Sequence, residues 1–143
     1  MHYSGLWCLG LGLLLSTTVG AEPAVYARVM SVYDGDTFTA EADVWPGHTI
    51  ETRVRISGVD TPEVGGRSKC DREQRAGALA RARLSELLNA GDVLLKEVRN
   101  DKYAGRVLAR VVAGGLDVAN VLLAEGLARE YHGGKRFEWC SAL

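Results

Sequence analysis

The sequence predicts a mainly β fold of the α+β class, in which a helix follows the third of five short strands. Two periodicities support this prediction. Apolar and polar residues alternate with a period of two over residues 25–57, which is typical of strands with one buried face. Residues 71–90 carry apolar side chains at spacings of three and four, which is typical of a helix with one buried face.

Turn residues separate the expected strands. Asp34-Gly35 is a hairpin signal, Pro46-Gly47 marks the next turn, and Gly114-Gly115 ends the last strand. The strands are expected over residues 25–33, 38–44, 50–56, 93–98 and 107–112.

The expected helices have residues suited to their ends. We expect Asp71 to cap the first helix and Gly91 to end it. Asp117 is expected to cap a shorter helix over residues 118–125, which Gly126 ends. Five strands with a helix after the third suit a small closed barrel of the OB type.

Length and charge limit the possible functions. The 143 residues are enough for one small domain. The formal net charge is -1, whereas a passive nucleic-acid coat protein is usually strongly basic. A phosphate-binding function would therefore depend on a few well-placed cations.

The N-terminus is interpreted as an export signal over residues 1–21, followed by a domain over residues 22–143. The apolar run 6–15 is too short for a stable membrane anchor, and Val19-Gly20-Ala21 offers small residues for cleavage after Ala21. We therefore expect a periplasmic or secreted protein with no stable membrane insertion after processing. The absence of Lys and Arg before the run leaves an uncleaved anchor as the alternative.

Two cysteines, Cys70 and Cys140, remain after this cleavage. An oxidising compartment favours a disulfide between them, which would tie the C-terminal tail to the first helix. Two buried thiols are the alternative. The sequence has no CxxC pair and no Cys/His cluster, so zinc is not expected.

Three clusters carry residues suited to phosphate chemistry. Taken singly, each has an ordinary explanation as a turn, a strand surface or a connection. The clusters are Asp34-Gly35-Asp36-Thr37; Arg53-Val54-Arg55 leading into Asp60-Thr61-Pro62-Glu63; and Asp101-Lys102-Tyr103-Ala104-Gly105-Arg106.

Together, in this order and spacing, the clusters resemble the staphylococcal nuclease family, or thermonucleases, over about residues 25–131. Asn120 and Gly126-Leu127-Ala128 fit the family's last helix. The resemblance implies a five-stranded OB barrel with about three helices packed on it, one bound Ca²⁺, and DNA and RNA as substrates of a monomeric nuclease.

The resemblance also implies a role for each site residue. Asp36, Asp60 and the Thr61 carbonyl would bind the metal. Glu63 would act as the general base, and Arg55 and Arg106 would bind the phosphate. Lys102 and Tyr103 would contact a neighbouring phosphate, and Tyr131 would stack on a base or touch a phosphate.

These residue types suit phosphodiester hydrolysis. A hard cation offsets the charge that repels an incoming water, and a carboxylate can take the proton of that water. Planar guanidinium groups bind the charge that grows on the phosphate oxygens in the transition state. Arg53 lies on the same strand face as Arg55 and is either a second phosphate contact or a solvated surface group.

One departure from the family pattern concerns the third cluster. The family usually reads Asp-x-Tyr-Gly-Arg, whereas Ala104 is inserted here before Gly105. The insertion leaves the register of Lys102 and Tyr103 relative to Arg106 open.

Two other functions are alternatives to the nuclease. One is a catalytically silent OB-fold module that binds nucleic acid, and the other is an exported scaffold protein. A pure binder has no need for Asp36, Asp60 and Glu63 to face a polyanion, because without a cation they oppose binding. These carboxylates therefore favour the enzyme.

Overall fold

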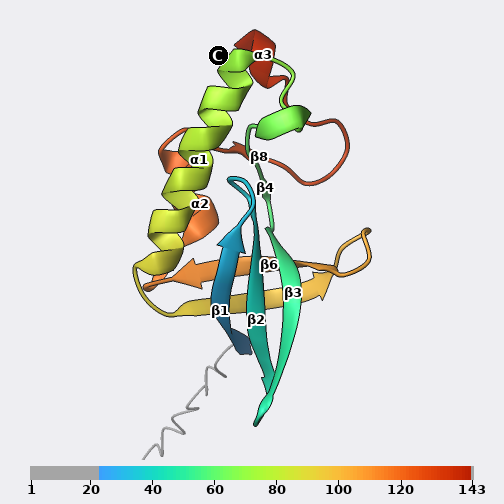
Figure 1. The fold of residues 1–143 in the computed structure, drawn as a ribbon, viewed down its shortest axis with the longest axis vertical. Helices are drawn as coiled ribbons and strands as arrows, with labels where there is room; N and C mark the ends of the chain where they lie inside the picture. The colour runs from blue at the N-terminus through green and yellow to red at the C-terminus, as the bar shows by residue number, and fades with distance from the viewer. Residues whose placement is uncertain (1–22, 143) are drawn as a thin grey trace, which may run out of the picture.

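The computed structural model describes residues 23–142, so the expected export signal lies outside the described residues. Five long strands form a closed mixed barrel, as predicted (Figure 1). Antiparallel pairs join the strands in the order β3-β2-β1-β5-β6, and a parallel pair between β3 and β6 closes the barrel. The strands are β1 (Ala24–Val32), β2 (Thr37–Trp45), β3 (His48–Ile56), β5 (Val93–Asn100) and β6 (Arg106–Ala113).

Helices and short strands complete the fold. The long helix α1 (Asp71–Asn89) rises along one side of the barrel to α3, near the C-terminus (Figure 1). The other elements are β4 (Val59–Asp60), the 3-10 helix η1 (Gly65–Arg67), β7 (Leu116–Asp117), α2 (Val118–Ala124), β8 (Arg129–Glu130) and α3 (Trp139–Ala142). The sequence pattern does not indicate β4, β7, β8, η1 or α3, because elements of two to four residues are too short to show a period.

The core is aliphatic and lies between the barrel and the helices. Phe38 is its largest fully buried side chain, and Val54 and Ile56 face inward from β3, as their alternation predicted. Leu84 of α1 and Leu122 of α2 close the same cluster. The polar residues of β3 are thereby directed outward.

The helix caps agree only in part with the sequence. Asp117 caps α2 as predicted, because its side chain accepts the Asn120 N–H. The prediction for α1 was wrong: the N-cap is Cys70, whose sulfur accepts the Glu73 N–H, and Asp71 is the first helical residue. The carboxylate of Asp71 then lies in the first turn, where it interacts favourably with the helix dipole.

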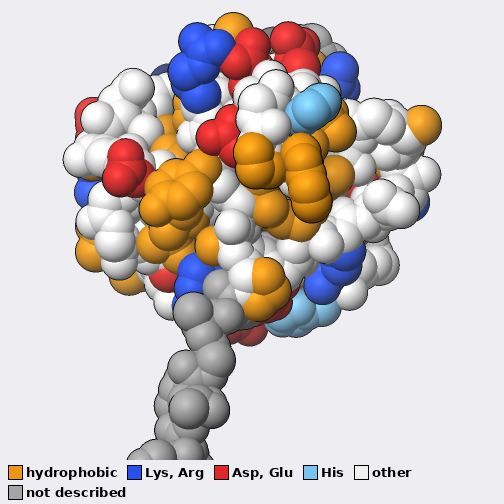
Figure 2. Space-filling view, turned by 90° about the horizontal axis from the view of Figure 1, so that it is seen from below, with side chains coloured by type: hydrophobic (Ala, Val, Ile, Leu, Met, Phe, Trp, Pro, Cys, Tyr) orange, Lys and Arg blue, Asp and Glu red, His pale blue; other side chains and the backbone are white. Residues whose placement is uncertain are grey.

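The end of the barrel seen in Figure 2 carries several exposed apolar side chains. The β2–β3 hairpin contributes to them, since Trp45 is 73% exposed and Ile50 is 54% exposed. No helix among residues 23–142 has the length and apolar character needed to cross a membrane.

Residues 131–140, here called the C-terminal strap, cross from β8 to α3. A disulfide joins Cys140 to Cys70, so the predicted pairing is present and ties the tail to the start of α1. Trp139 is buried, and the Tyr131 N–H donates to the Gly58 carbonyl at 2.9 Å. The strap is therefore fastened at both ends.

Candidate active site

Two buried carboxylates meet at one arginine where β1, β3 and β4 end. The Arg55 Nη1 lies 2.6 Å from Asp36 Oδ1, and its Nη2 lies 3.5 Å from Asp60 Oδ1. Asp36 and Asp60 are 2% and 1% exposed. The structure thus brings together two residues that are 24 positions apart in the sequence.

Backbone contacts hold these two loops in place. The Thr61 N–H donates to Asp36 Oδ2 at 3.0 Å, and the Ile56 N–H donates to the Asp36 carbonyl at 2.9 Å. A Cβ at Gly35 would lie 2.6 Å from Ala80 Cβ, so only glycine fits between the loop and α1. The Asp-Gly-Asp sequence therefore serves the close approach of the two loops as well as the turn.

Two residues of α1 contact the backbone of Glu63. The buried Glu73 accepts the Glu63 N–H at 3.2 Å and the Lys69 N–H at 2.7 Å. Gly77, one turn further along α1, lies against the same backbone, because a Cβ there would be 2.4 Å from the Glu63 carbonyl oxygen. The orientation of the Glu63 loop thus depends on two residues of the helix.

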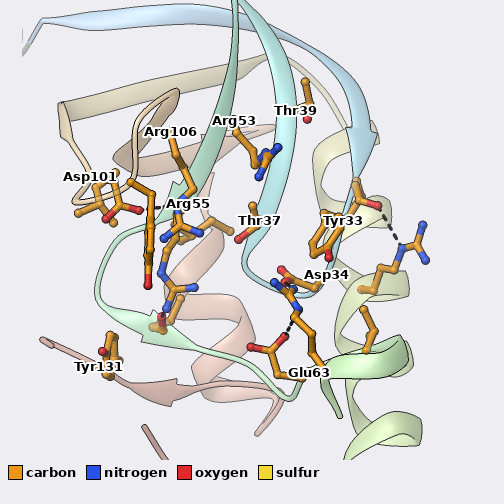
Figure 3. A pocket seen from close by; sticks show the side chains of 18 of the residues that line it. Tyr33, Asp34, Thr37, Thr39, Arg53, Arg55, Glu63, Asp101, Arg106 and Tyr131 are labelled. Carbon is orange, nitrogen blue, oxygen red and sulfur yellow. Dashed lines mark hydrogen bonds and ion pairs between the residues drawn. The ribbon is translucent and has the colours of Figure 1, made fainter. Parts of the chain in front are cut away.

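An open groove of about 1780 Å³ runs over the outer face of β2, β3 and β6 (Figure 3). Eight Lys or Arg residues line it, against three Asp or Glu residues. Arg106 is the β-sheet partner of Arg53, so both lie on the outward face that also holds Arg55. Arg53 and Arg99 have no carboxylate partner within the described chain. A chain of net charge -1 thus places eight of its 17 Lys and Arg residues in one groove.

The inserted Ala104 is absorbed in a turn between β5 and β6. Gly105 takes a positive φ of 73°, and the Asp101 N–H donates to the Arg106 carbonyl. The Arg106 guanidinium pairs with Asp101 and lies 4.7 Å from the Tyr103 ring centroid. The sequence left the relative position of Tyr103 and Arg106 open, and in the structure their side chains stack at the rim of the groove.

The remaining expected substrate contacts also line the groove. Lys102 and Tyr103 stand exposed at its rim. The Tyr131 ring lies 5.7 Å from the Arg55 guanidinium (Figure 3).

Comparisons with known proteins agree with this geometry. The family described as staphylococcal nuclease homologues matches residues 53–138, which is more than half of the chain. The chain belongs to this family. Endonuclease YncB of Bacillus subtilis (strain 168) is 41% identical over 99 residues, which are 67% of this chain and 43% of that protein. The SPbeta prophage-derived endonuclease YokF of the same strain is also 41% identical over 99 residues, which are 67% of this chain and 31% of that protein. The chain thus spans less than half the length of these relatives.

In this member of the staphylococcal nuclease family, two further arginines enter the site. Arg67 Nε lies 3.0 Å from Glu63 Oε2, and Arg67 Nη2 lies 3.0 Å from Asp34. Arg136 comes from the C-terminal strap and binds Asp60 and Glu63. The sequence pattern indicates neither arginine, because their segments have no period. The expected disulfide is the one signal that points to the tail.

Neighbouring charged groups of the site shift one another's pKa values. Burial and the neighbouring Asp36 carboxylate raise the pKa of Asp34 to about 7, while the hydrogen bond that the Asp36 N–H donates to Asp34 acts in the opposite direction. Burial by itself would lower the pKa of Arg55, but the Asp36 and Asp60 carboxylates raise it above its usual value. Arg55 is therefore a permanent cation between two buried anions.

The donor set fits a hard cation. Asp36, Asp60 and the Thr61 carbonyl offer oxygen atoms only, which is the ligand type that calcium prefers. Three oxygens, from Asp60, Thr61 and Glu63, already bind one cationic group, the Arg136 guanidinium. Within residues 23–142 no three His, Cys, Asp or Glu side chains form a metal-binding group by themselves.

Proposed function

We propose that this protein is an endonuclease that hydrolyses phosphodiester bonds in DNA and RNA with the help of a divalent cation, Ca²⁺. Family membership and the printed names of the two relatives support this activity. The cationic groove supports a polyanionic substrate, because clustered cations raise the local concentration of phosphates.

One observation carries the proposal. Arg55 joins Asp36 and Asp60 beneath a groove whose wall holds Glu63. Asp36, Asp60 and the Thr61 carbonyl would hold the cation, which would offset the phosphate charge and position a water. A protein that only binds nucleic acid has no use for carboxylates at this place.

The side chains of the chain then divide the remaining chemistry. Glu63 takes a proton from the attacking water, a step typically worth ~10²–10⁴ in rate. Arg55 and Arg106 donate to the phosphate oxygens, whose charge grows in the transition state. Lys102, Tyr103 and Tyr131 bind the flanking nucleotides, because phosphates attract cations and aromatic rings stack on any base.

The decisive experiment incubates the protein with plasmid, linear single-stranded DNA and RNA, with Ca²⁺ or with a chelator, and follows cleavage on a gel. We expect cleavage of all three with Ca²⁺. We expect Glu63→Gln to lower turnover by ~10²–10⁴-fold, with an unchanged circular dichroism spectrum. Glu51→Gln, an exposed site on β3 outside the groove, is the matched control.

Each part of the proposal has its own contrary result. Full activity of a folded Glu63→Gln protein would remove Glu63 as the base. Cleavage that persists in chelator would remove the metal. Binding of DNA without cleavage would favour the silent binding module.

We further propose that the protein is exported to the periplasm or the medium. The apolar run at 6–15 and the Cys70–Cys140 disulfide support this location, because disulfides persist in oxidising compartments. Cell fractionation followed by non-reducing mass spectrometry tests it. A cytoplasmic protein with two free thiols would refute it.

A further inference from the structure

Arg136 contacts Asp60, the Thr61 carbonyl and Glu63, which together are called the acidic cluster here. Its Nε donates to Asp60 Oδ1 at 2.7 Å, and its Nη2 lies 2.6 Å from the same oxygen. Nη2 also donates to the Thr61 carbonyl at 3.2 Å, and Nη1 donates to Glu63 Oε1. One guanidinium thus binds two of the three expected metal ligands and the expected base.

The C-terminal strap holds this arginine in place. Trp139, three residues further on, donates its Nε1–H to Asp60 Oδ2 at 3.3 Å, and Cys140 is bonded to Cys70. On the other side, the Tyr131 N–H donates to the Gly58 carbonyl at 2.9 Å. Because both flanks are fastened, a displaced Arg136 side chain stays within reach of the cluster.

Arg136 and a divalent cation need the same space. A calcium ion lies ~2.3–2.6 Å from each oxygen ligand. An ion at that distance from both Asp60 Oδ1 and the Thr61 carbonyl would overlap with Nη2, which touches both oxygens. The two cations would also repel each other near the buried Asp60. One must leave before the other binds.

We propose that Arg136 is a built-in competitor of the divalent cation and determines how much metal the site requires. The inference rests on the proposed function, since it places the metal at Asp60 and Thr61. The competitor is part of the chain, so its effective concentration is fixed. The apparent metal affinity is therefore the intrinsic affinity multiplied by the fraction of molecules in which Arg136 has left Asp60.

Removal of Arg136 leaves Asp60 with partners. Arg55 Nη2 remains 3.5 Å away and the Trp139 indole still donates to the carboxylate. We therefore expect Arg136→Ala to fold. Arg136→Gln, which keeps amide donors but loses the charge, is the second variant, and it decides the question if the alanine variant does not fold.

The test is calorimetric titration of the full disulfide-bonded chain with CaCl₂, without substrate. We expect both Arg136 variants to bind Ca²⁺ at least about tenfold more tightly than the wild type, the factor for a site that is free in one molecule in ten. Lys135→Ala is the matched control, because it removes the same charge from the adjacent, exposed position of the strap. Its affinity should equal that of the wild type.

The outcomes separate this inference from the proposed function. Equal or weaker Ca²⁺ binding by the Arg136 variants overturns the inference and leaves the nuclease proposal intact. An equal gain in Lys135→Ala also overturns it, because the effect would then be one of general charge. No binding by any of the proteins overturns both the competitor and the metal of the proposed mechanism.

Discussion

We expect a single methyl group added at Gly77 to lower the catalytic rate much more than it lowers the stability. A Cβ on this residue would lie 2.4 Å from the Glu63 carbonyl oxygen and 2.9 Å from the Pro62 carbonyl oxygen, whereas ordinary contacts begin at 3.4 Å. In Gly77→Ala, the helix and the Glu63 loop must therefore move apart by about 1 Å. The obstruction is backbone on both sides, so no side-chain rotation can relieve it.

The two consequences differ in size. Alanine in place of glycine favours the helix by about 1 kcal/mol, and overpacking costs about 1–3 kcal/mol. The free energy of unfolding should therefore fall by only about 0–2 kcal/mol. A displacement of about 1 Å at a catalytic group can lower the rate ~10²-fold. We expect Gly77→Ala to be a folded protein with about a hundredth of the wild-type turnover.

Two measurements check this expectation. Initial rates on a fluorescently quenched oligonucleotide with saturating Ca²⁺ give turnover, and urea unfolding gives stability. Gly66→Ala is the control, because a Cβ there meets no atom within 4 Å although the residue belongs to the same loop. Wild-type turnover in a stable Gly77→Ala protein would refute the idea that α1 sets the position of Glu63.

Three further perturbations follow from the same contacts. Arg55→Ala leaves the buried Asp36 without its cationic partner, whereas Asp60 keeps Arg136. We therefore expect the free energy of unfolding in urea, with chelator present, to fall by about 3–5 kcal/mol. An undiminished stability would contradict the bridging role of Arg55. Replacement of both Cys70 and Cys140 by serine should lower the free energy of unfolding by about 4 kcal/mol, because the disulfide joins residues that are 70 positions apart. Equal stability of the oxidised wild type and the variant would exclude that contribution. In Glu73→Gln, the side chain can accept only one of the two backbone N–H groups, those of Glu63 and Lys69, that the carboxylate accepts now. We therefore expect stability to fall by about 1–3 kcal/mol and turnover to fall with it. A loss of stability alone would show that Glu73 does not orient Glu63.

The sequence predicted the five strands and two longer helices because burial imposes a period on them. Phe38 and Val54 alternate with polar neighbours, and both are fully buried. Ile50 follows the same alternation but is exposed, because the β2–β3 hairpin continues beyond the barrel, where no layer covers it. Periodicity thus indicates which face a residue occupies and leaves open whether anything packs there.

The site was predictable where one short motif carries several residues, and it was not predictable where distant segments meet. Asp36, Arg55 and Asp60 were named from motifs, and the structure brings them into contact. Their roles, like that of Glu63, stay predictions until the variants are measured. Arg136 could not be placed from the sequence, because its position depends on a turn between two fastened ends and its contacts with the cluster are tertiary. Glu73 belongs to α1, whose amphipathic pattern marks it as an ordinary polar residue, although it is buried.

The unequal placement of two tryptophans has an optical consequence. Trp139 is 3% exposed and donates its indole N–H to Asp60, whereas Trp45 is 73% exposed at the tip of the β2–β3 hairpin. Indole emission depends on the polarity and charge around the ring. Any event that changes the charge around Asp60 should therefore alter the blue-shifted part of the spectrum, while the red-shifted part from Trp45 stays constant as an internal reference. Within residues 23–142 these two tryptophans thus form a ratiometric fluorophore pair for following the acidic cluster without a label.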